Sequence, residues 1–78
     1  MPKFLDSHGL GGATEEQLRQ AQAAPVGQDG ARALNIMYNQ NDNKVFCLTE
    51  APSREAVEKY HQDFGMKCDW ITEVKTTA

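Results

Sequence analysis

Apolar and polar residues alternate along three stretches of the chain, and a short apolar run forms a fourth. A period of two is typical of β-strands, so we expect strands at residues 3–8, 34–39, 45–48 and 68–75. In the first of these, Phe4, Asp6 and His8 fall on one face. The polar segment 40–43 separates the second and third strands and predicts a hairpin.

Two other stretches carry the signals of helices. The first begins at a capping box formed by Thr14 and Gln17, and Pro25 ends it within about three turns. The second begins after Ser53 as N-cap and ends at Gly65. Its apolar stripe recurs at i, i+3 and i+4 and consists of Ala56, Val57, Tyr60, His61 and Phe64.

The resulting order of elements is βαββαβ, which predicts a ferredoxin-like α+β fold with residues 1–78 as a single domain. Right-handed crossovers then place the strands in the order fourth, first, third, second in one antiparallel sheet. Both helices must cover the same face of that sheet. The other face stays open and carries large apolar residues, so we expect an identical chain to cover it in a homodimer.

Composition excludes several classes of protein. With 78 residues, 40% hydrophobic and 24% charged, the chain lies in the range of small globular domains. Its net charge of −3 and the absence of a Lys or Arg run argue against nucleic acid as a partner. No uninterrupted apolar stretch of membrane-spanning or signal-peptide kind is present, which predicts a cytoplasmic protein with no membrane partner. Cys47 and Cys68 are expected to be free thiols.

The residues able to ligate a metal are few and, in this topology, converge. We expect the end of the first strand, the starts of the third and fourth strands and the end of the second helix to meet at one edge of the sheet. The side chains brought there are Asp6, His8, Cys47, His61 and Cys68. Imidazole, thiolate and carboxylate together suit nickel, zinc, copper or cobalt better than magnesium or calcium.

Each of these residues also has an ordinary role. Taken one at a time, the ordinary role is the better reading of each histidine: a solvated strand end for His8 and a hydrogen-bonded boundary residue for His61. The usual role of a free cysteine such as Cys47 is a small buried hydrophobe. Asp6 on a half-buried face needs a partner. A Cys–His nucleophilic pair could be drawn, but no flanking motif supplies an oxyanion hole or a nucleophile turn, so we do not expect an enzyme.

Three segments carry a family resemblance: residues 1–8, residues 44–53, and His61 late in the second helix. Together they resemble a family of small bacterial nickel-binding proteins with a dimeric ferredoxin-like fold, known largely as a domain of unknown function. The resemblance implies a homodimer that binds nickel through His, Cys and acidic side chains. It also implies a second histidine four residues after His61, where this chain has Gly65, so Asp63 or Cys68 would have to replace that ligand.

Three hypotheses follow for function. The first is a non-catalytic metal-binding homodimer with His8, Cys47 and His61 as ligands and Asp6 as a ligand or as the partner that orients a histidine. The second is a dimeric α/β-barrel module whose cavity between sheet and helices, lined by Trp70 and Tyr38, holds a small organic ligand. The third is a structural or interaction domain.

Overall fold

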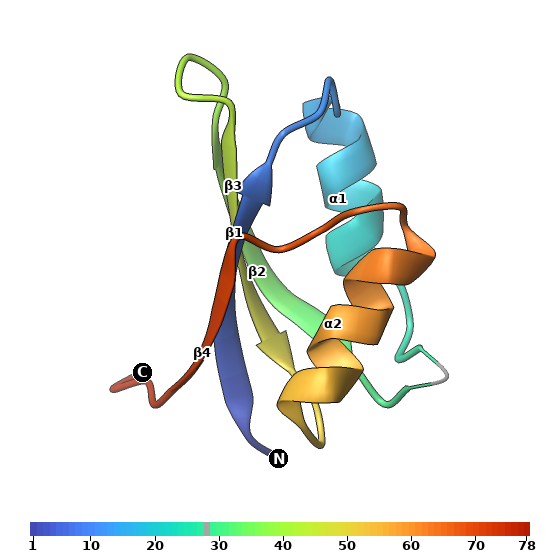
Figure 1. The fold of residues 1–78 in the computed structure, drawn as a ribbon, viewed down its shortest axis with the longest axis vertical. Coiled ribbons are helices and arrows are strands. Elements are labelled where there is room, and N and C mark those ends of the chain that lie inside the picture. Colours follow the sequence, from blue (N-terminus) through green and yellow to red (C-terminus); the bar gives the residue numbers. More distant parts are fainter. Residues whose placement is uncertain (28) are drawn as a thin grey trace.

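The computed structural model describes residues 1–27 and 29–78, and position 28 lies outside the described residues. Six elements follow one another, with both helices on one side of the sheet (Figure 1). They are β1 (Lys3–Gly9), α1 (Glu15–Ala23), β2 (Arg32–Asn39), β3 (Lys44–Glu50), α2 (Arg54–Asp63) and β4 (Trp70–Val74). The ferredoxin-like α+β fold predicted from the sequence is confirmed.

The strands form one antiparallel sheet in the order β2-β3-β1-β4, which is the predicted order. Strand β1 is therefore internal, with β3 on one side and β4 on the other. The register places Asp6 opposite Cys47 on β3 and opposite Ile71 on β4. Directly opposed residues point to the same face of a sheet, so this register decides which side chains meet beneath the helices.

Local signals fix where the helices begin. Thr14 and Gln17 form a complete capping box, in which each side chain accepts a hydrogen bond from the other residue's backbone N–H. Ser53 caps α2 by accepting a hydrogen bond from the N–H of Ala56. The hairpin between β2 and β3 turns with Asn43 at φ 53°, a left-handed conformation that Asn tolerates well.

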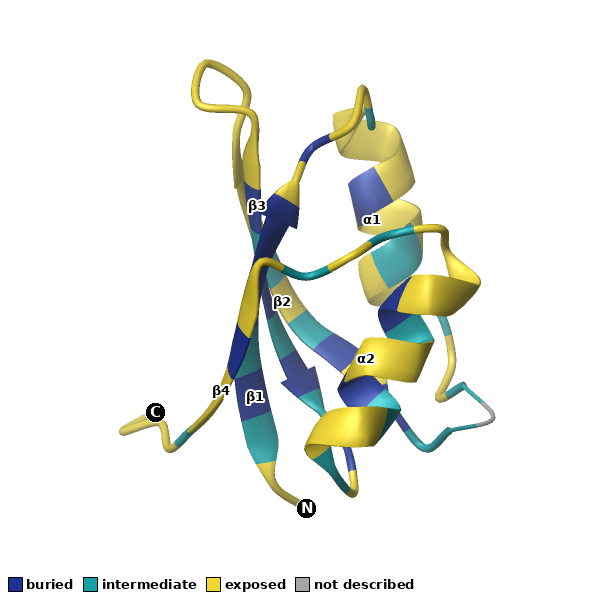
Figure 2. Cartoon of the chain, in the orientation of Figure 1, coloured by how far each residue is buried: buried dark blue, intermediate teal, exposed yellow. Residues whose placement is uncertain are grey.

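Two apolar clusters fill the space between the sheet and the helices, and Figure 2 shows the buried positions gathered on the inner strands and on the helix sides that face them. The cluster beneath α2 consists of Phe4, Ala31, Ala51, Val57 and Ile71. The cluster beneath α1 consists of Leu10, Leu18, Val45 and Cys47. Since α1 buries Leu18 and otherwise presents small or polar side chains, it covers the sheet thinly.

The face of the sheet away from the helices carries two central rows of mostly apolar side chains. By register, one row runs across the four strands as Met37, Phe46, Ser7 and Trp70. The next runs as Asn35, Leu48, Leu5 and Thr72. Trp70 and Met37 are exposed, at 43% and 42%. This face matches the open apolar face expected from the sequence.

Strand β4 begins at Trp70, so the strand predicted to start at residue 68 starts two residues later. Cys68 and Asp69 form the approach to the strand, and the N–H of Asp69 donates to the carbonyl of Ser7. Cys68 consequently does not alternate with Trp70 as predicted and packs against the cluster beneath α2. Among the described residues, no helix has the length and apolar character needed to cross a membrane.

Candidate metal centre

Three of the five predicted site residues come from the two central strands. Asp6 and Cys47 are direct neighbours across β1 and β3, and His8 follows Asp6 by two positions on the same face. All three are buried beneath the helices. Asp6 and Cys47 lie midway along their strands, so the site is nearer the middle of the sheet than the edge predicted from the sequence.

His61 is contributed by the last turn of α2. It lies one turn after Val57 on the buried stripe of that helix, and its side chain is 4% exposed. The helix ends directly afterwards because Gly65 adopts a left-handed φ of 73°, which lets the N–H of Met66 donate back to the carbonyl of His61. The packing of α2 against the sheet and the position at which the helix ends together place the imidazole of His61 over β1 and β3.

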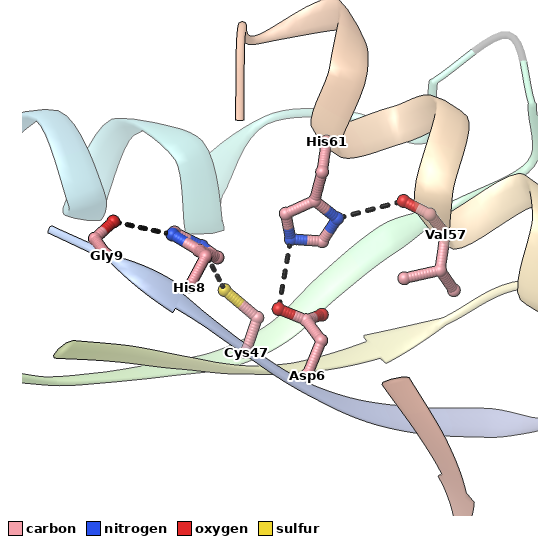
Figure 3. Close-up of polar contacts among 6 residues, drawn as sticks. All are labelled: Asp6, His8, Gly9, Cys47, Val57 and His61. Atoms are coloured by element: carbon pink, nitrogen blue, oxygen red, sulfur yellow. Dashed lines mark hydrogen bonds and ion pairs between the residues drawn. The ribbon is translucent and has the colours of Figure 1, made fainter. Parts of the chain in front are cut away.

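Both imidazoles are oriented by the backbone (Figure 3). Nδ1 of His8 lies 2.9 Å from the carbonyl oxygen of Gly9, and Nδ1 of His61 lies 2.9 Å from that of Val57. A carbonyl oxygen only accepts, so each Nδ1 must carry the hydrogen and donate it. The Nε2 atoms are thereby left to face the other side chains, which is the usual way a protein prepares histidines for a metal.

The Nε2 atoms face sulfur and oxygen at short range (Figure 3). Nε2 of His8 lies 3.6 Å from Sγ of Cys47, and Nε2 of His61 lies 3.3 Å from Oδ1 of Asp6. The four donor atoms, one from each residue, all lie within 4.8 Å of one another. The structure therefore brings Asp6, His8, Cys47 and His61 into one buried cluster.

An ion pair between His61 and Asp6 carries the charges of this cluster. Burial alone would lower the pKa of His61, but the carboxylate of Asp6 and the thiols of Cys47 and Cys68 outweigh it and raise that pKa to about 12. His61 is then an imidazolium whose Nε2 proton faces Asp6. Burial raises the pKa of the Cys47 thiol, which keeps it protonated in the metal-free protein.

Asp6 is the least satisfied group of the cluster. It is completely buried, and neither of its carboxylate oxygens accepts a hydrogen bond from any described residue; its contact with His61 is an ion pair alone. A buried carboxylate normally accepts several hydrogen bonds, because burying it without them costs several kcal/mol. The carboxylate therefore has lone pairs free for a further cation.

The donor set and its spacing suit a transition metal. Bonds of about 2.0–2.3 Å to nitrogen, oxygen and sulfur place neighbouring ligand atoms of a tetrahedral site roughly 3.3–3.8 Å apart. The two contacts of 3.3 and 3.6 Å already fall in this range. An ion here would take the place of the Nε2 proton of His61 and of the Cys47 thiol proton. Two nitrogens, one sulfur and one carboxylate favour nickel, zinc, copper or cobalt over magnesium or calcium.

Comparison with known proteins agrees with this geometry. Residues 4–74 match the family model described as "Nickel responsive protein SCO4226-like". The chain belongs to this family. The resemblance to a small bacterial nickel-related family, inferred from the sequence, is thereby confirmed.

Among solved structures, the chain is similar to SCO4226 from Streptomyces coelicolor A3(2), with 32% sequence identity and a TM-score of 0.79. The match covers 97% of this chain and 99% of that protein. Comparison with curated proteins gives no match. For this member of the SCO4226-like family, the donor cluster is consistent with a relation to metal ions, as is the family description.

Cys68 lies outside the four-residue cluster. It is a half-buried free thiol that packs against the apolar cluster beneath α2, close enough to His61 to help raise the pKa of that imidazole. Asp63 is exposed at the end of α2 and is not part of the cluster. Gly65, where the resemblance implied a histidine, has a backbone role, because its left-handed conformation ends the helix.

Sequence reasoning missed two contributors to this site. The carbonyls of Gly9 and Val57 accept hydrogen bonds from the histidines and orient them. For Val57 the spacing of one helical turn before His61 was an available signal. The contact with Gly9 depends on the rotamer of His8, which a sequence pattern does not specify.

A cavity of about 400 Å³ lies between the sheet and the helices, with His8, Cys47 and His61 in its wall. The aromatic lining predicted from the sequence is wrong. Tyr38 lies on a smaller hollow beside α1, where its hydroxyl donates to Glu15, and Trp70 lies at the edge between α2 and β4.

Proposed function

We propose that this protein binds nickel with His8, Cys47, His61 and Asp6 and acts as a homodimer. The observation that carries the proposal is the convergence of four different donor atoms within 4.8 Å in a buried site. The two histidines support it, because both present Nε2 to the cluster. The free lone pairs of Asp6 support it further, because they leave a negative charge that His61 alone does not satisfy.

Each residue has a stated role in the proposal. His8 and His61 supply Nε2, Cys47 supplies a thiolate after losing its proton, and Asp6 supplies a carboxylate as the fourth ligand. Cys68 lies beside His61 and affects its charge without joining the cluster. The description of the family as nickel responsive favours nickel, whereas the donor set by itself would also accept zinc, copper or cobalt.

We propose a binding role without catalysis, since the cluster is explained by ligation and no nucleophile with an oxyanion hole is needed. The free thiols of Cys47 and Cys68 are expected in a reducing compartment, for which we propose the cytoplasm.

The homodimer is supported by the open face of the sheet. Leu5, Phe46 and Leu48 are only partly covered there, and Trp70 is exposed beside them. A contiguous apolar surface of this kind is typical of a contact between subunits, and a second identical face is self-complementary under two-fold symmetry.

The metal proposal is tested by calorimetric titration of the metal-free protein with nickel, zinc, copper and cobalt. We expect one ion per chain, and stabilisation of roughly 2.7 kcal/mol at a hundredfold excess over the dissociation constant. His8→Ala and Cys47→Ala should each weaken nickel binding at least about tenfold, the usual penalty for disturbing a metal's ligand environment.

The matched control is Asp63→Ala, which removes an exposed carboxylate of α2 outside the cluster and should leave nickel affinity unchanged. Wild-type protein that takes up no nickel, or His8→Ala and Asp63→Ala proteins that bind it equally well, would contradict the proposed function. Tighter binding of another of the four ions, with the same response to the variants, would keep the site and reassign the metal.

A further inference from the structure

The cavity beside the metal cluster is larger than the cluster needs. Its volume of about 400 Å³ lies within the range of small-molecule sites, whereas a single ion occupies a small part of it. Most of its surface is apolar, and its wall includes Ala21 of α1, Ala24 directly after that helix, Ile36 of β2 and Phe64 at the end of α2. The metal-binding side chains thus form one wall of an apolar cavity that opens to solvent.

The space arises from the side chains of α1. This helix sends Leu18 into the core, but Ala21 and Ala24 are too short to fill the room between it and α2. Protein interiors are normally close-packed, with few voids larger than a water molecule. A cavity that small residues keep clear next to a polar cluster is therefore suited to a ligand.

Charge restricts the ligand. The residues that line the cavity, all of them in the described part of the chain, include no Asp, Glu, Lys or Arg. Once a divalent ion is bound, the carboxylate of Asp6 and the thiolate of Cys47 balance its two positive charges. A charged ligand would then have no counter-ion in the wall, and burying it would be unfavourable. The wall favours a neutral molecule.

We propose that this cavity binds a small, neutral, largely apolar molecule whose nitrogen donor completes the coordination of the metal held by His8, Cys47 and His61. The inference rests on the proposed metal function and adds a second ligand to it. The four protein ligands fill a tetrahedral site, so the added donor would expand the metal to five-coordinate, as zinc does in catalytic sites. An aromatic nitrogen heterocycle matches both the imidazoles at one end of the cavity and the apolar wall at the other.

The test uses 4-phenylimidazole, which combines a neutral nitrogen donor with an apolar body, and plain imidazole, which has the donor alone. Both are titrated into nickel-loaded and metal-free protein and followed by calorimetry and by the visible spectrum of nickel. We expect 4-phenylimidazole to bind the loaded protein about tenfold or more tightly than imidazole does, because its phenyl ring leaves water. It should also bind the loaded protein at least about tenfold more tightly than the metal-free protein and shift the nickel bands.

Two substitutions on one helix separate the cavity from the metal. Ala21→Leu fills the cavity and should weaken 4-phenylimidazole binding about tenfold or more, whereas Ala23→Leu, on the exposed side of α1, should not. Nickel affinity should be the same in both. Ala24→Leu repeats the test at another point of the wall, and thermal unfolding shows that each variant is folded.

The outcomes distinguish the two proposals. Protein that binds no nickel overturns the metal function and this inference together. Protein that binds nickel but prefers 4-phenylimidazole no more than imidazole, or an Ala21→Leu variant that behaves as Ala23→Leu does, overturns the inference alone. Dissociation of a dimer by the probe, seen in sedimentation, would show that side chains of a second copy fill the cavity and would also overturn it.

Discussion

Each face of the sheet departs from the usual distribution of polar and apolar residues, in opposite ways: polar groups are buried within the core of one, and apolar side chains are exposed on the other. On the helix-covered face, the fully enclosed groups include Asp6, His8 and His61, all at or below 3% exposure. On the open face, Trp70 and Met37 are more than 40% exposed. Soluble domains ordinarily bury apolar groups and leave charged ones in water, so a buried polar cluster and an exposed apolar patch are both informative.

Both faces depend on the same central strand. Alternation along β1 sends Asp6 and His8 toward the helices and Leu5 and Ser7 toward the open face. Each face is therefore incomplete in a single metal-free chain. The helix-covered face, called the inner face from here on, has donor atoms that suit a cation. The open face, called the outer face, has apolar area that suits a second copy. Substitutions that perturb one face at a time separate the two.

The largest effect on stability should come from the ion pair of the inner face. His61→Ala leaves Asp6 buried without a counter-charge, which typically costs about 3–5 kcal/mol of unfolding free energy. Trp70→Ala on the open face should cost far less in the monomer, because the side chain is already exposed. Urea unfolding of the metal-free proteins at pH 6 makes the comparison.

The sign of the pH dependence follows from the raised pKa of His61. The stabilisation by the ion pair is fully present below the unfolded pKa of 6.5 and is lost as pH rises toward about 12. His61→Ala should therefore cost less at pH 9 than at pH 6. Adding Asp6→Asn to His61→Ala should restore part of the loss. A cost below about 1 kcal/mol at pH 6 would mean that Asp6 is not held as a buried charge.

Nickel affinity should change steeply in the opposite direction with pH. In the metal-free protein both His61 and Cys47 hold a proton near neutrality, and ligation displaces both. Mass action for two protons predicts that the dissociation constant falls about a hundredfold for each pH unit. Titrations at pH 6.5, 7.0 and 7.5 in buffers of different ionisation enthalpy give the proton count directly. Release of fewer than one proton per bound nickel ion would be inconsistent with ligation by both His61 and Cys47.

A charged side chain introduced on the outer face should weaken dimerisation. Trp70→Glu places a carboxylate in the proposed dimer contact twice, once per subunit, and should weaken dimerisation at least about tenfold. Phe64→Glu is the control, because Phe64 is a similarly exposed aromatic residue, at 55%, that lies on the helix side. Analytical ultracentrifugation measures both. A wild-type protein that stays monomeric at micromolar concentration would refute the dimer, and equal responses would refute this face as its contact.

The smallest effect is expected at Thr49. Its hydroxyl is fully buried and has no hydrogen-bond partner among the described residues, so Thr49→Val should stabilise the metal-free protein by about 1 kcal/mol. Thr72→Val, on the exposed face of β4, should have almost no effect by comparison. Thermal unfolding compares the two. A loss of stability in Thr49→Val would show that the hydroxyl does bond within the inner face.

The fold could be predicted because its signals are local and agree with one another. The capping residues Thr14 and Ser53 begin the helices where expected, and the order of elements then leaves few topologies. The start of β4 was predicted less well. The alternation of side chains in the sequence extends back to Cys68, but the chain changes direction there before it pairs with β1. A pattern of apolar and polar residues does not indicate such a change of direction.

The membership of the site could be predicted only in part. The register that pairs Asp6 with Cys47 follows from the topology, and the phase of α2 brings His61 above them. The exclusion of Cys68 depends on its place in the loop before β4, which alternation misassigned. The cavity was expected between sheet and helices, but its lining was not, because its space depends on how far α1 lies from the sheet.

We propose that Asp6, His8, Cys47 and His61 hold one ion between them. The most direct measurement is anomalous X-ray diffraction at the nickel edge from crystals of the nickel-loaded protein. We expect one strong anomalous peak per chain, about 2.0–2.3 Å from Nε2 of both histidines, from Sγ of Cys47 and from a carboxylate oxygen of Asp6. A nickel peak bound elsewhere, or a donor cluster that keeps its ion pair and thiol in the presence of saturating nickel, would contradict it.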